Sequence, residues 1–301
     1  MSVLVVGTVA FDSIETPSGS AERILGGSAS YFALGASFFA PVRVVGVTGQ
    51  DFPQDYLDLF TERNIDITGI KRENGDTFHW RGRYHEDINQ RDTIELHLNV
   101  LAGYQPELPD NYRDAEYVFL GNIDPVMQMS VLDQIRRLKL VACDTMDHWI
   151  GASRDELPKV LKRIETLVIN DSEARLLSGY DNIVKAARAI LRMGPKTVLI
   201  KRGEYGVLQF SDNSVFATPA YPLEEVFDPT GAGDSFAGGM MGHLARTGDV
   251  TDGGLRRAIV YGSVVASFTV EDFGVKRLTE LSLPEIEERY QRFVQLTDFH
   301  S

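Results

Sequence analysis

The sequence predicts an α/β fold in which a mostly parallel sheet is covered by helices on both faces. Short apolar runs rich in β-branched residues recur along the chain, and helical patterns separate several of them. Apolar runs of this length are typical of strands buried on both faces, and alternation with helices implies right-handed crossovers. The predicted strands are residues 3–6, 42–47, 117–120, 138–143, 166–169 and 197–200.

The predicted helices lie between these strands and dominate the last third of the chain. Pro284 sits in the first turn of the last predicted helix, which is a favourable position for proline. The helices are expected at residues 28–39, at 126–138, as one or two helices within 173–192, and at 233–247, 252–271 and 284–296.

Two segments interrupt this alternation. Residues 8–27 carry turn formers between short alternating stretches, and residues 77–100 show a period of two on either side of a polar turn near Asn89. Both patterns indicate antiparallel hairpins, which we interpret as a small lid beside the main sheet. The simpler alternative is a surface hairpin without a catalytic part. We therefore expect a single domain over residues 1–301 that carries these two lid segments.

Composition narrows the classes of partner. The chain has 301 residues and a formal net charge of -13, so its field repels nucleic-acid backbones and anionic lipids. We expect neither a nucleic acid nor a membrane as partner, because no stretch approaches the ~20 apolar residues of a membrane span. The only cysteine, Cys143, ends an apolar run and cannot form an internal disulfide. These features predict a cytoplasmic protein.

The most informative stretch is residues 228–239, which read Asp-Pro-Thr-Gly-Ala-Gly-Asp-Ser-Phe-Ala-Gly-Gly. A tight turn rich in glycine leads here into the start of a buried helix. The first backbone N–H groups of a helix have no internal acceptor, and the helix dipole favours negative charge near them. The N–H groups of Gly231, Ala232, Gly233 and Asp234 are therefore expected to form an anion-binding cradle.

Asp234 needs a role of its own, because a carboxylate beside an anion site is repulsive. It is equally suited to accept a proton from a hydroxyl nucleophile and to cap the helix.

Other glycine-rich motifs that bind nucleotides fit this sequence poorly. A P-loop needs Gly-Lys-Ser/Thr where this chain has Gly-Asp-Ser, and the dinucleotide fingerprint needs a second glycine in register after Gly7.

The stretch 228–239 resembles the C-terminal signature of the PfkB carbohydrate kinase family, which includes ribokinase, fructokinase and adenosine kinase. The resemblance implies a three-layer α/β/α ribokinase-like core with an antiparallel β lid. It also implies an ATP-dependent kinase that transfers the γ-phosphoryl group to a hydroxymethyl group of a sugar or nucleoside. In this family the second aspartate of the signature is the catalytic base, a role that falls on Asp234, and the amides of Gly231, Ala232 and Gly233 stabilise the transferred group.

Further residues match the nucleotide side of the family. Asn170 and Glu173 resemble its Asn-x-x-Glu element. In the family this element helps to bind the ATP phosphates and holds Mg²⁺ through water molecules. Mg²⁺ keeps several waters, so few protein ligands are expected. Helix capping is the alternative role for this pair. The other positions that the resemblance assigns to ATP are Lys201, Gly203, Gly206, Thr230, Ser263 and Gly274.

The acceptor end matches the family less closely. Asp12 corresponds to an aspartate that binds substrate hydroxyls, and Gly26 and Gly27 resemble the glycine pair next to the substrate. Tyr31 stands where the family usually has asparagine, and Ala10 replaces another asparagine. The set of groups that binds hydroxyls is thus reduced, which motivates a second hypothesis, a non-catalytic sensor that keeps the kinase fold.

Aromatic residues could supply part of the acceptor site. Phe11, Tyr31, Phe78 and Trp80 can stack on a nucleobase or can pack the lid onto the core. Arg81 and Arg83 are two residues apart and are expected on one side of the lid. The histidines lack metal-ligand spacing, so we expect no zinc site. The expected partners are a small sugar or nucleoside and a second copy of the chain bound through the lid.

Overall fold

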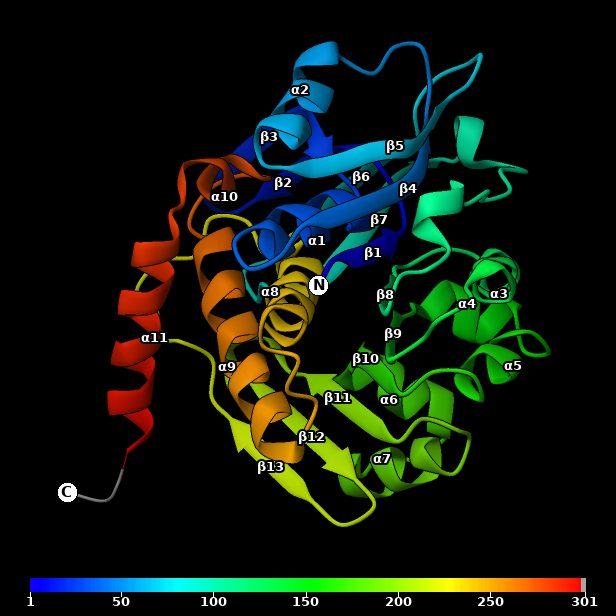
Figure 1. The fold of residues 1–301 in the computed structure, drawn as a ribbon. Coiled ribbons are helices and arrows are strands. Elements are labelled where there is room, and N and C mark those ends of the chain that lie inside the picture. The colour runs from blue at the N-terminus through cyan, green and yellow to red at the C-terminus, as the bar shows by residue number, and fades with distance from the viewer. Residues whose placement is uncertain (299–301) are drawn as a thin grey trace.

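The computed structural model describes residues 1–298 and contains two sheets (Figure 1). The predicted domain range of 1–301 includes residues 299–301, which lie outside the described residues. The large sheet has nine strands in the order β13-β12-β11-β10-β9-β8-β1-β4-β5. Its strands are β1 (Val3–Val6), β4 (Val42–Thr48), β5 (Ile65–Arg72), β8 (Tyr117–Leu120), β9 (Leu140–Asp144), β10 (Thr166–Asn170), β11 (Thr197–Lys201), β12 (Val207–Ser211) and β13 (Val215–Thr218).

The pairing within this sheet follows the length of the connections. Strands β5, β4, β1, β8, β9, β10 and β11 are mutually parallel. Strands β12 and β13 follow β11 through short turns and pair antiparallel. All six predicted strands are present, and their carboxyl ends lie at one edge of the sheet because the strands run in one direction.

Helices cover both faces (Figure 1). One face carries α1 (Ser28–Ser37), α2 (Gln54–Glu62), α8 (Ala232–Thr247), α9 (Asp252–Thr269), α10 (Lys276–Glu280) and α11 (Leu283–Thr297). The other carries α3 (Pro125–Gln134), α4 (Asp147–Ala152), α5 (Leu157–Leu161), α6 (Asp171–Ser178) and α7 (Ile183–Leu191). Short 3-10 turns are η1 (Asn99–Leu101), η2 (Asp110–Tyr112) and η3 (Gly203–Tyr205). The region 173–192 thus forms two helices. Within residues 1–298, none of the helices combines the length and the apolar character that a membrane span requires.

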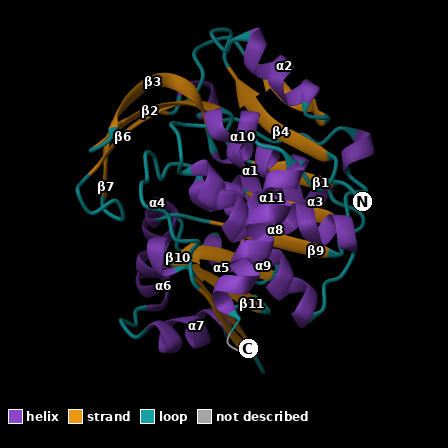
Figure 2. Cartoon of the chain, turned by 90° about the vertical axis from the view of Figure 1, so that its left-hand side faces the viewer, coloured by secondary structure: helices purple, strands orange, loops and turns teal. Residues whose placement is uncertain are grey.

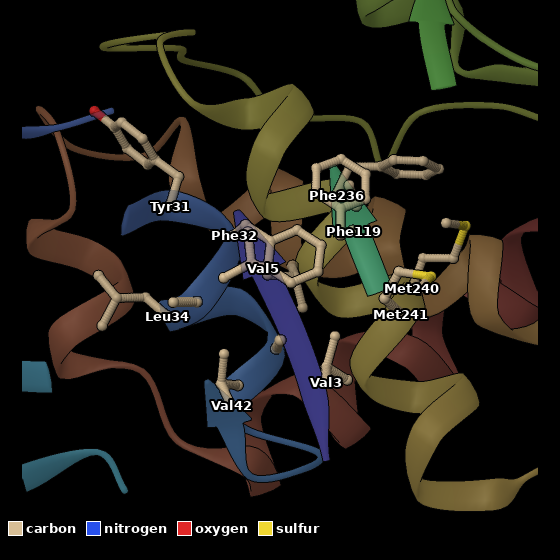
Figure 3. Close-up of a cluster of buried hydrophobic side chains, with 14 of the residues drawn as sticks. Val3, Val5, Tyr31, Phe32, Leu34, Val42, Phe119, Phe236, Met240 and Met241 are labelled. Carbon is tan, nitrogen blue, oxygen red and sulfur yellow. The ribbon is translucent and has the colours of Figure 1, made fainter. Parts of the chain in front are cut away.

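The strands divide the core into two layers. Val3 and Val5 belong to the cluster under α1 and α8, whereas Leu4 belongs to the cluster under α3 and α5. This is the alternation expected of a strand buried on both faces. Figure 3 shows the first cluster, in which the rings of Phe32 on α1 and Phe119 on β8 stack with centroids 4.4 Å apart.

Helix α8 lies unusually close to its two neighbours, α1 and α9. A Cβ atom on Gly238 would lie 2.2 Å from the carbonyl oxygen of Phe32 in α1. A Cβ atom on Gly262 of α9 would lie 2.5 Å from the carbonyl oxygen of Phe236 in α8. Glycine is therefore required at these two crossings, and it fixes α8 between the two helices.

The second sheet is formed by the two segments that the sequence analysis assigned to a lid, and this sheet is called the lid below. It contains β2 (Ala10–Thr16), β3 (Gly19–Gly26), β6 (His79–Tyr84) and β7 (Arg91–His97) in the order β3-β2-β6-β7. Each predicted hairpin is antiparallel, and a parallel pairing of β2 with β6 joins the two. Figure 2 shows this sheet as a curved arch set apart from the large sheet.

Candidate active site

Three strands of the large sheet end in side chains that could carry chemistry. Asp144 ends β9, Asn170 ends β10 and Lys201 ends β11. These strands are neighbours and parallel, so the three residues share the carboxyl edge of the sheet. The start of α8 approaches the same edge, because a Cβ atom on Gly233 would lie 2.7 Å from the Nζ atom of Lys201.

The turn before α8 has the form of an anion cradle. Gly231 is the N-cap residue and adopts a left-handed conformation with φ of 74°. Within residues 1–298, no oxygen accepts a hydrogen bond from the N–H groups of Gly231, Gly233 or Asp234. Ala232 differs from the prediction, because its N–H donates to the carbonyl oxygen of Pro229 at 3.3 Å. Three of the four predicted amides thus remain free to bind an anion.

Asp228 and Thr230 hold this turn in place. The buried Asp228 carboxylate accepts hydrogen bonds from the N–H of Thr230 at 2.8 Å and from the N–H of Gly274 at 2.9 Å. The Thr230 hydroxyl donates to the Tyr84 hydroxyl of the lid at 3.1 Å. Gly274 and Thr230, both predicted on the nucleotide side, therefore connect the cradle to the loop after α9 and to the lid.

Asp234 lies half-buried in the first turn of α8. Burial and, to a smaller extent, the negative charge of Asp144 raise its pKa, the positive charges of Lys201 and Arg91 oppose this rise, and the resulting pKa is about 7. No hydrogen bond from another described residue to its carboxylate stabilises the charged form. A carboxyl group of this kind can accept a proton near neutral pH, as a general base must.

Asp144, Glu173 and Lys201 form a largely buried cluster next to Asp234. The Nζ atom of Lys201 lies 3.1 Å from Oδ2 of Asp144. Burial and the negative charge of Asp144 raise the pKa of Glu173, the positive charge of Lys201 opposes them, and the resulting pKa is about 8. Burial acts to lower the pKa of Lys201, but the negative charges of Asp144 and Glu173 outweigh it and the pKa is raised.

Asn170 and Glu173 form a reciprocal capping box at the start of α6. The Asn170 side chain accepts from the N–H of Glu173, and the Glu173 carboxylate accepts from the N–H of Asn170, both at 2.8 Å. The capping role left open by the sequence is therefore present. It leaves one carboxylate oxygen of Glu173 without a partner in that box.

The carboxylates at this edge suit a divalent cation held through water. Asp144, Glu173 and Asp234 face a single ammonium group from Lys201, so an added positive charge would relieve their repulsion. No group of three or more His, Cys, Asp or Glu residues within residues 1–298 has the geometry of a direct metal site. This arrangement fits Mg²⁺, which takes few protein ligands and retains its waters.

Asp12 occupies the junction between the lid and the core. Its side chain is buried, and a Cβ atom on Gly26 would lie 2.1 Å from the carboxylate. Burial raises the pKa of Asp12, a hydrogen bond from the Gly27 backbone opposes this, and the charges of Asp228 and Asp234 support it, so that the resulting pKa is about 7. The structure therefore brings Asp12, Gly26 and Gly27 together near Asp234.

The remaining nucleotide-side residues are less uniform. Gly203 and Gly206 have positive φ angles in the turn after β11, as a strand-end turn requires. A Cβ atom on Gly203 would lie 2.0 Å from Oδ1 of Asn89, so the tip of the lid contacts this turn. Ser263 is buried within α9, and its hydroxyl donates to the carbonyl oxygen of Ile259.

The aromatic residues divide between core and lid. Phe11 and Tyr31 are 2% and 1% exposed, so neither ring is available for stacking on a ligand. The ring of Tyr31 packs beneath Gly231, where a Cβ atom would lie 2.2 Å from it, and its hydroxyl points away from the core cluster (Figure 3). Phe78 and Trp80 remain half-buried. The ring of Trp80 lies over Gly82 on the lid sheet.

Two charged residues of the site escaped the sequence analysis. Asp144 could have been found, because it follows a predicted strand just as Lys201 does. Arg91 carries no local signal, since its proximity to Asp12 and Asp234 depends on how the lid folds over the sheet.

Two surface cavities lie apart from this cluster. One of about 610 Å³ lies between residues 71–76 and 99–107, and one of about 300 Å³ is lined by residues of β2, β3, β6 and β7. Neither is lined by Asp12 or Asp234, so the site is assigned from the chemistry of its residues and not from cavity size.

Comparison with known proteins identifies the family of this chain. The family described as "pfkB family carbohydrate kinase" matches residues 2–280. The cytidine kinase of Thermococcus kodakarensis is 33% identical over 252 residues, which cover 82% of this chain and 89% of the relative. The nucleoside kinase of Methanothermobacter thermautotrophicus is 29% identical over 312 residues, which cover 97% and 95%.

A solved structure shows the same fold. Aminoimidazole riboside kinase from Salmonella enterica, complexed with aminoimidazole riboside and an ATP analog, superposes with a TM-score of 0.74 at 19% identity. The match covers 96% of this chain and 100% of that chain. The chain therefore belongs to the pfkB family of carbohydrate kinases and is a phosphotransferase with an alcohol group as acceptor.

Proposed function

We propose that this kinase transfers the γ-phosphoryl group of ATP to the hydroxymethyl group of a nucleoside, with Asp234 as the general base. The observation that carries the proposal is the half-buried Asp234 carboxylate beside three free backbone amides at the start of α8. The acceptor is proposed from the two relatives named as cytidine and nucleoside kinases and from the half-buried Trp80 on the lid.

In the proposed reaction, Asp234 takes the proton of the acceptor hydroxyl. The hydroxyl oxygen then forms a bond to the γ-phosphorus, and the bond from that phosphorus to the bridging oxygen of ADP breaks. The free N–H groups of Gly231, Gly233 and Asp234 donate to the oxygens of the migrating group, where negative charge develops. Asp12 binds a hydroxyl group of the acceptor from the lid side.

Mg²⁺ would be held through water by Glu173 and Asp144, with Asn170 orienting the Glu173 carboxylate. When bound, the ion offsets the charge of the ATP phosphates. The proposed nucleotide side comprises Lys201, Gly203, Gly206, Thr230 and Gly274. Ser263 remains part of this proposal only as a packing residue near the nucleotide, because its hydroxyl is bonded within α9.

The lid completes the proposed site in a single domain. It encloses the acceptor between Asp12 and the cradle and excludes water, which limits hydrolysis of ATP. The reducing cytoplasm is the proposed location, since Cys143 is a free and buried thiol.

The test is a phosphoryl-transfer screen with Mg²⁺ and ATP over ribose, fructose, cytidine, uridine, adenosine and inosine. ADP release is measured, and each product is identified by mass spectrometry. We expect a nucleoside monophosphate as the main product, and we expect the Asp234→Asn variant to form it at least ~10²-fold more slowly. Transfer to a free sugar alone would contradict the nucleoside assignment, and transfer to none of the six would contradict the proposed function.

We also propose that the lid mediates a homodimer. Strand β7 forms an edge of the lid sheet, and its residues Ile94 and Leu96 and the following Leu98 are each more than 40% exposed. An edge strand with exposed apolar side chains favours association with another chain. Sedimentation of the wild type and of Ile94→Lys tests this. A wild type that stays monomeric at micromolar concentration would contradict the dimer.

A further inference from the structure

The two faces of the lid carry different arginines. Strand β6 alternates, so Trp80 and Tyr84 lie on one face, while Arg83 lies on the other. The register pairs Asp12 with Trp80 and pairs Tyr84 with Arg91. Residues paired directly across strands share a face, so Arg91 lies on the face that carries Asp12. This inner face is the one that contacts the anion cradle, through the Tyr84 and Thr230 hydroxyls.

Arg91 is oriented by its neighbours on that face. Its guanidinium carbon lies over the Trp80 ring, 5.3 Å from the ring centroid. Burial raises the pKa of Tyr84, and the positive charge of Arg91 is the largest influence that opposes this rise. A guanidinium stacked on an aromatic ring keeps its plane and its donors available. The stack therefore holds the donors of Arg91 beside Tyr84 and the cradle turn.

Arg91 also differs from the other lid arginines in its charge balance. Arg23, Arg81 and Arg83 form ion pairs with Asp51, Glu22 and Glu15, respectively. Within the described part of the chain, Arg91 forms no ion pair, although its charge acts on both Asp12 and Asp234. An exposed guanidinium without a carboxylate partner therefore lies close enough to influence both the proposed acceptor-binding residue and the proposed base.

We propose that Arg91 is a catalytic residue carried by the lid, whose guanidinium donates hydrogen bonds to the phosphoryl group as it passes between the two substrates. This inference rests on the proposed function and extends it. The acceptor oxygen bonds to phosphorus, ADP departs with the electron pair of the broken bond, and Asp234 keeps the proton. Negative charge spreads over the three remaining phosphoryl oxygens. The free amides of the cradle approach that charge from α8, and Arg91 approaches it from the lid.

The first experiment compares Arg91→Met with Arg83→Met, a matched control on the opposite face of the same lid. Turnover is measured with Mg²⁺, ATP and the acceptor that the wild type uses best. We expect Arg91→Met to lower kcat by about 10²-fold or more, as the loss of a charge-stabilising donor does elsewhere, with little change in the acceptor KM. Arg91→Lys should recover only part of the rate, because an ammonium group lacks the planar fork of donors. Arg83→Met should stay within about twofold of the wild type, because its ion pair with Glu15 is exposed.

Each contrary outcome has a distinct meaning. A kcat unchanged in Arg91→Met overturns the inference and leaves the proposed function standing. A raised acceptor KM with unchanged kcat means that Arg91 binds an anionic group of the acceptor instead, which also overturns it. Full recovery of the rate by Arg91→Lys would show that charge alone suffices and that the forked contact is absent.

A pH profile separates a direct contact from a structural role. The charges of Asp144, Lys201 and Arg91 act on Asp234, and Asp12 interacts with it as well. Removal of Arg91 should therefore move the acid limb of the kcat profile to higher pH. A purely structural role in holding Tyr84 would lower the unfolding temperature without moving this limb, and that result would overturn the inference.

A second measurement does not depend on the acceptor. ADP with aluminium fluoride mimics the planar phosphoryl group, and its dissociation constant is measured by calorimetry in the presence of Mg²⁺. We expect Arg91→Met to weaken binding of this pair by about tenfold or more while binding of ADP alone stays the same. Equal binding by wild type and variant overturns the role of Arg91 even if no acceptor is found. Failure of the wild type to bind ADP would overturn the proposed function itself.

Discussion

The carboxyl edge of the large sheet and the outer face of the lid hold their charges in opposite ways. At the edge, the carboxylates of Asp144, Glu173 and Asp234 share one lysine in a largely buried setting. On the lid, Arg81 and Arg83 each have a glutamate partner, and both pairs are exposed to water. Buried charges that are not balanced shift in pKa, whereas exposed pairs contribute little to stability. The comparison distinguishes the buried carboxylates, whose shifted pKa values suit them for catalysis, from the exposed ion pairs, which interact mainly with water.

The largest expected effect is the loss of the proposed base. Asp234→Asn preserves shape and removes the proton acceptor, so we expect kcat to fall by at least ~10²-fold with nearly unchanged nucleotide affinity. Steady-state kinetics and nucleotide titration measure the two quantities. Near-normal turnover of this variant would show that Asp234 is not the general base. The contrast between the sheet edge and the lid surface would then have no catalytic meaning.

The next effect concerns the lysine that the edge carboxylates share. Lys201→Met leaves the carboxylates of Asp144 and Glu173 without their cation, so we expect unfolding to become easier by about 3 kcal/mol. Chemical denaturation measures this change. The double variant Asp144→Asn/Lys201→Met is the control, because it removes both members of the pair and should recover part of the loss. Equal stability of the single variant and the wild type would show that the edge is already screened by water.

A third prediction uses pH. Burial raises the pKa of Asp234 and of Asp12 to about 7. A base acts in its ionised form, so kcat/KM should fall as the pH drops through about 7, and not near the ordinary aspartate value. Because the groups interact, the measured limb belongs to the cluster and not to one residue. An acid limb near pH 4 would contradict the raised pKa values.

The free energy of unfolding should decrease as the pH rises, whereas kcat/KM should increase. A carboxyl group with a raised pKa in the folded state stabilises the protein fully below its unfolded pKa, and this contribution is lost as the pH rises through the folded value. Asp234→Asn removes this dependence. The variant should therefore be more stable than the wild type at pH 8, by the order of 1 kcal/mol or about 2–4 °C, and the gain should shrink at pH 5. Thermal unfolding at both values checks the sign.

The smallest effect is expected on the lid surface. Glu15→Gln removes one member of the exposed pair with Arg83. We expect a change in unfolding free energy within about 0.5 kcal/mol, because exposed pairs are screened by water and salt. Chemical denaturation at low and high salt measures it. A loss of more than about 1 kcal/mol would show that the lid surface depends on its ion pairs, and the contrast with the carboxyl edge would fail.

The same two regions differ in how far the sequence predicts them. The cradle could be predicted because its geometry is local: Gly231, Gly233 and Asp234 are consecutive or nearly so at a helix start. The six central strands could be predicted because short, continuous apolar runs rich in β-branched residues favour buried strands. Strand β5 escaped because Asp66 and Lys71 interrupt its apolar pattern. The alignment of Arg91 with Asp12 needs three separate strands, and no local pattern encodes it.

Predictions for individual residues were correct where local sequence determines the structure and were incomplete where the packing of the folded chain determines it. The turn at Gly231 predicted four free amides, but Ala232 donates back to Pro229 because the turn closes tightly on itself. Phe11 and Tyr31 could have stacked on a ligand or packed inside, and both pack inside. A sequence shows that a residue is aromatic, and only the folded chain shows which of its faces is still uncovered.

The close contact of α8 with α1 and α9 limits how this enzyme can change. Since Gly238 and Gly262 leave no room for even a methyl group, a larger residue at either position would displace the helix whose first turn is the proposed phosphate site. New acceptor preferences must then arise elsewhere, in the lid strands, which tolerate exchange of their exposed side chains. We therefore expect the proposed phosphate-binding half to tolerate few substitutions and the proposed acceptor-binding half to tolerate many.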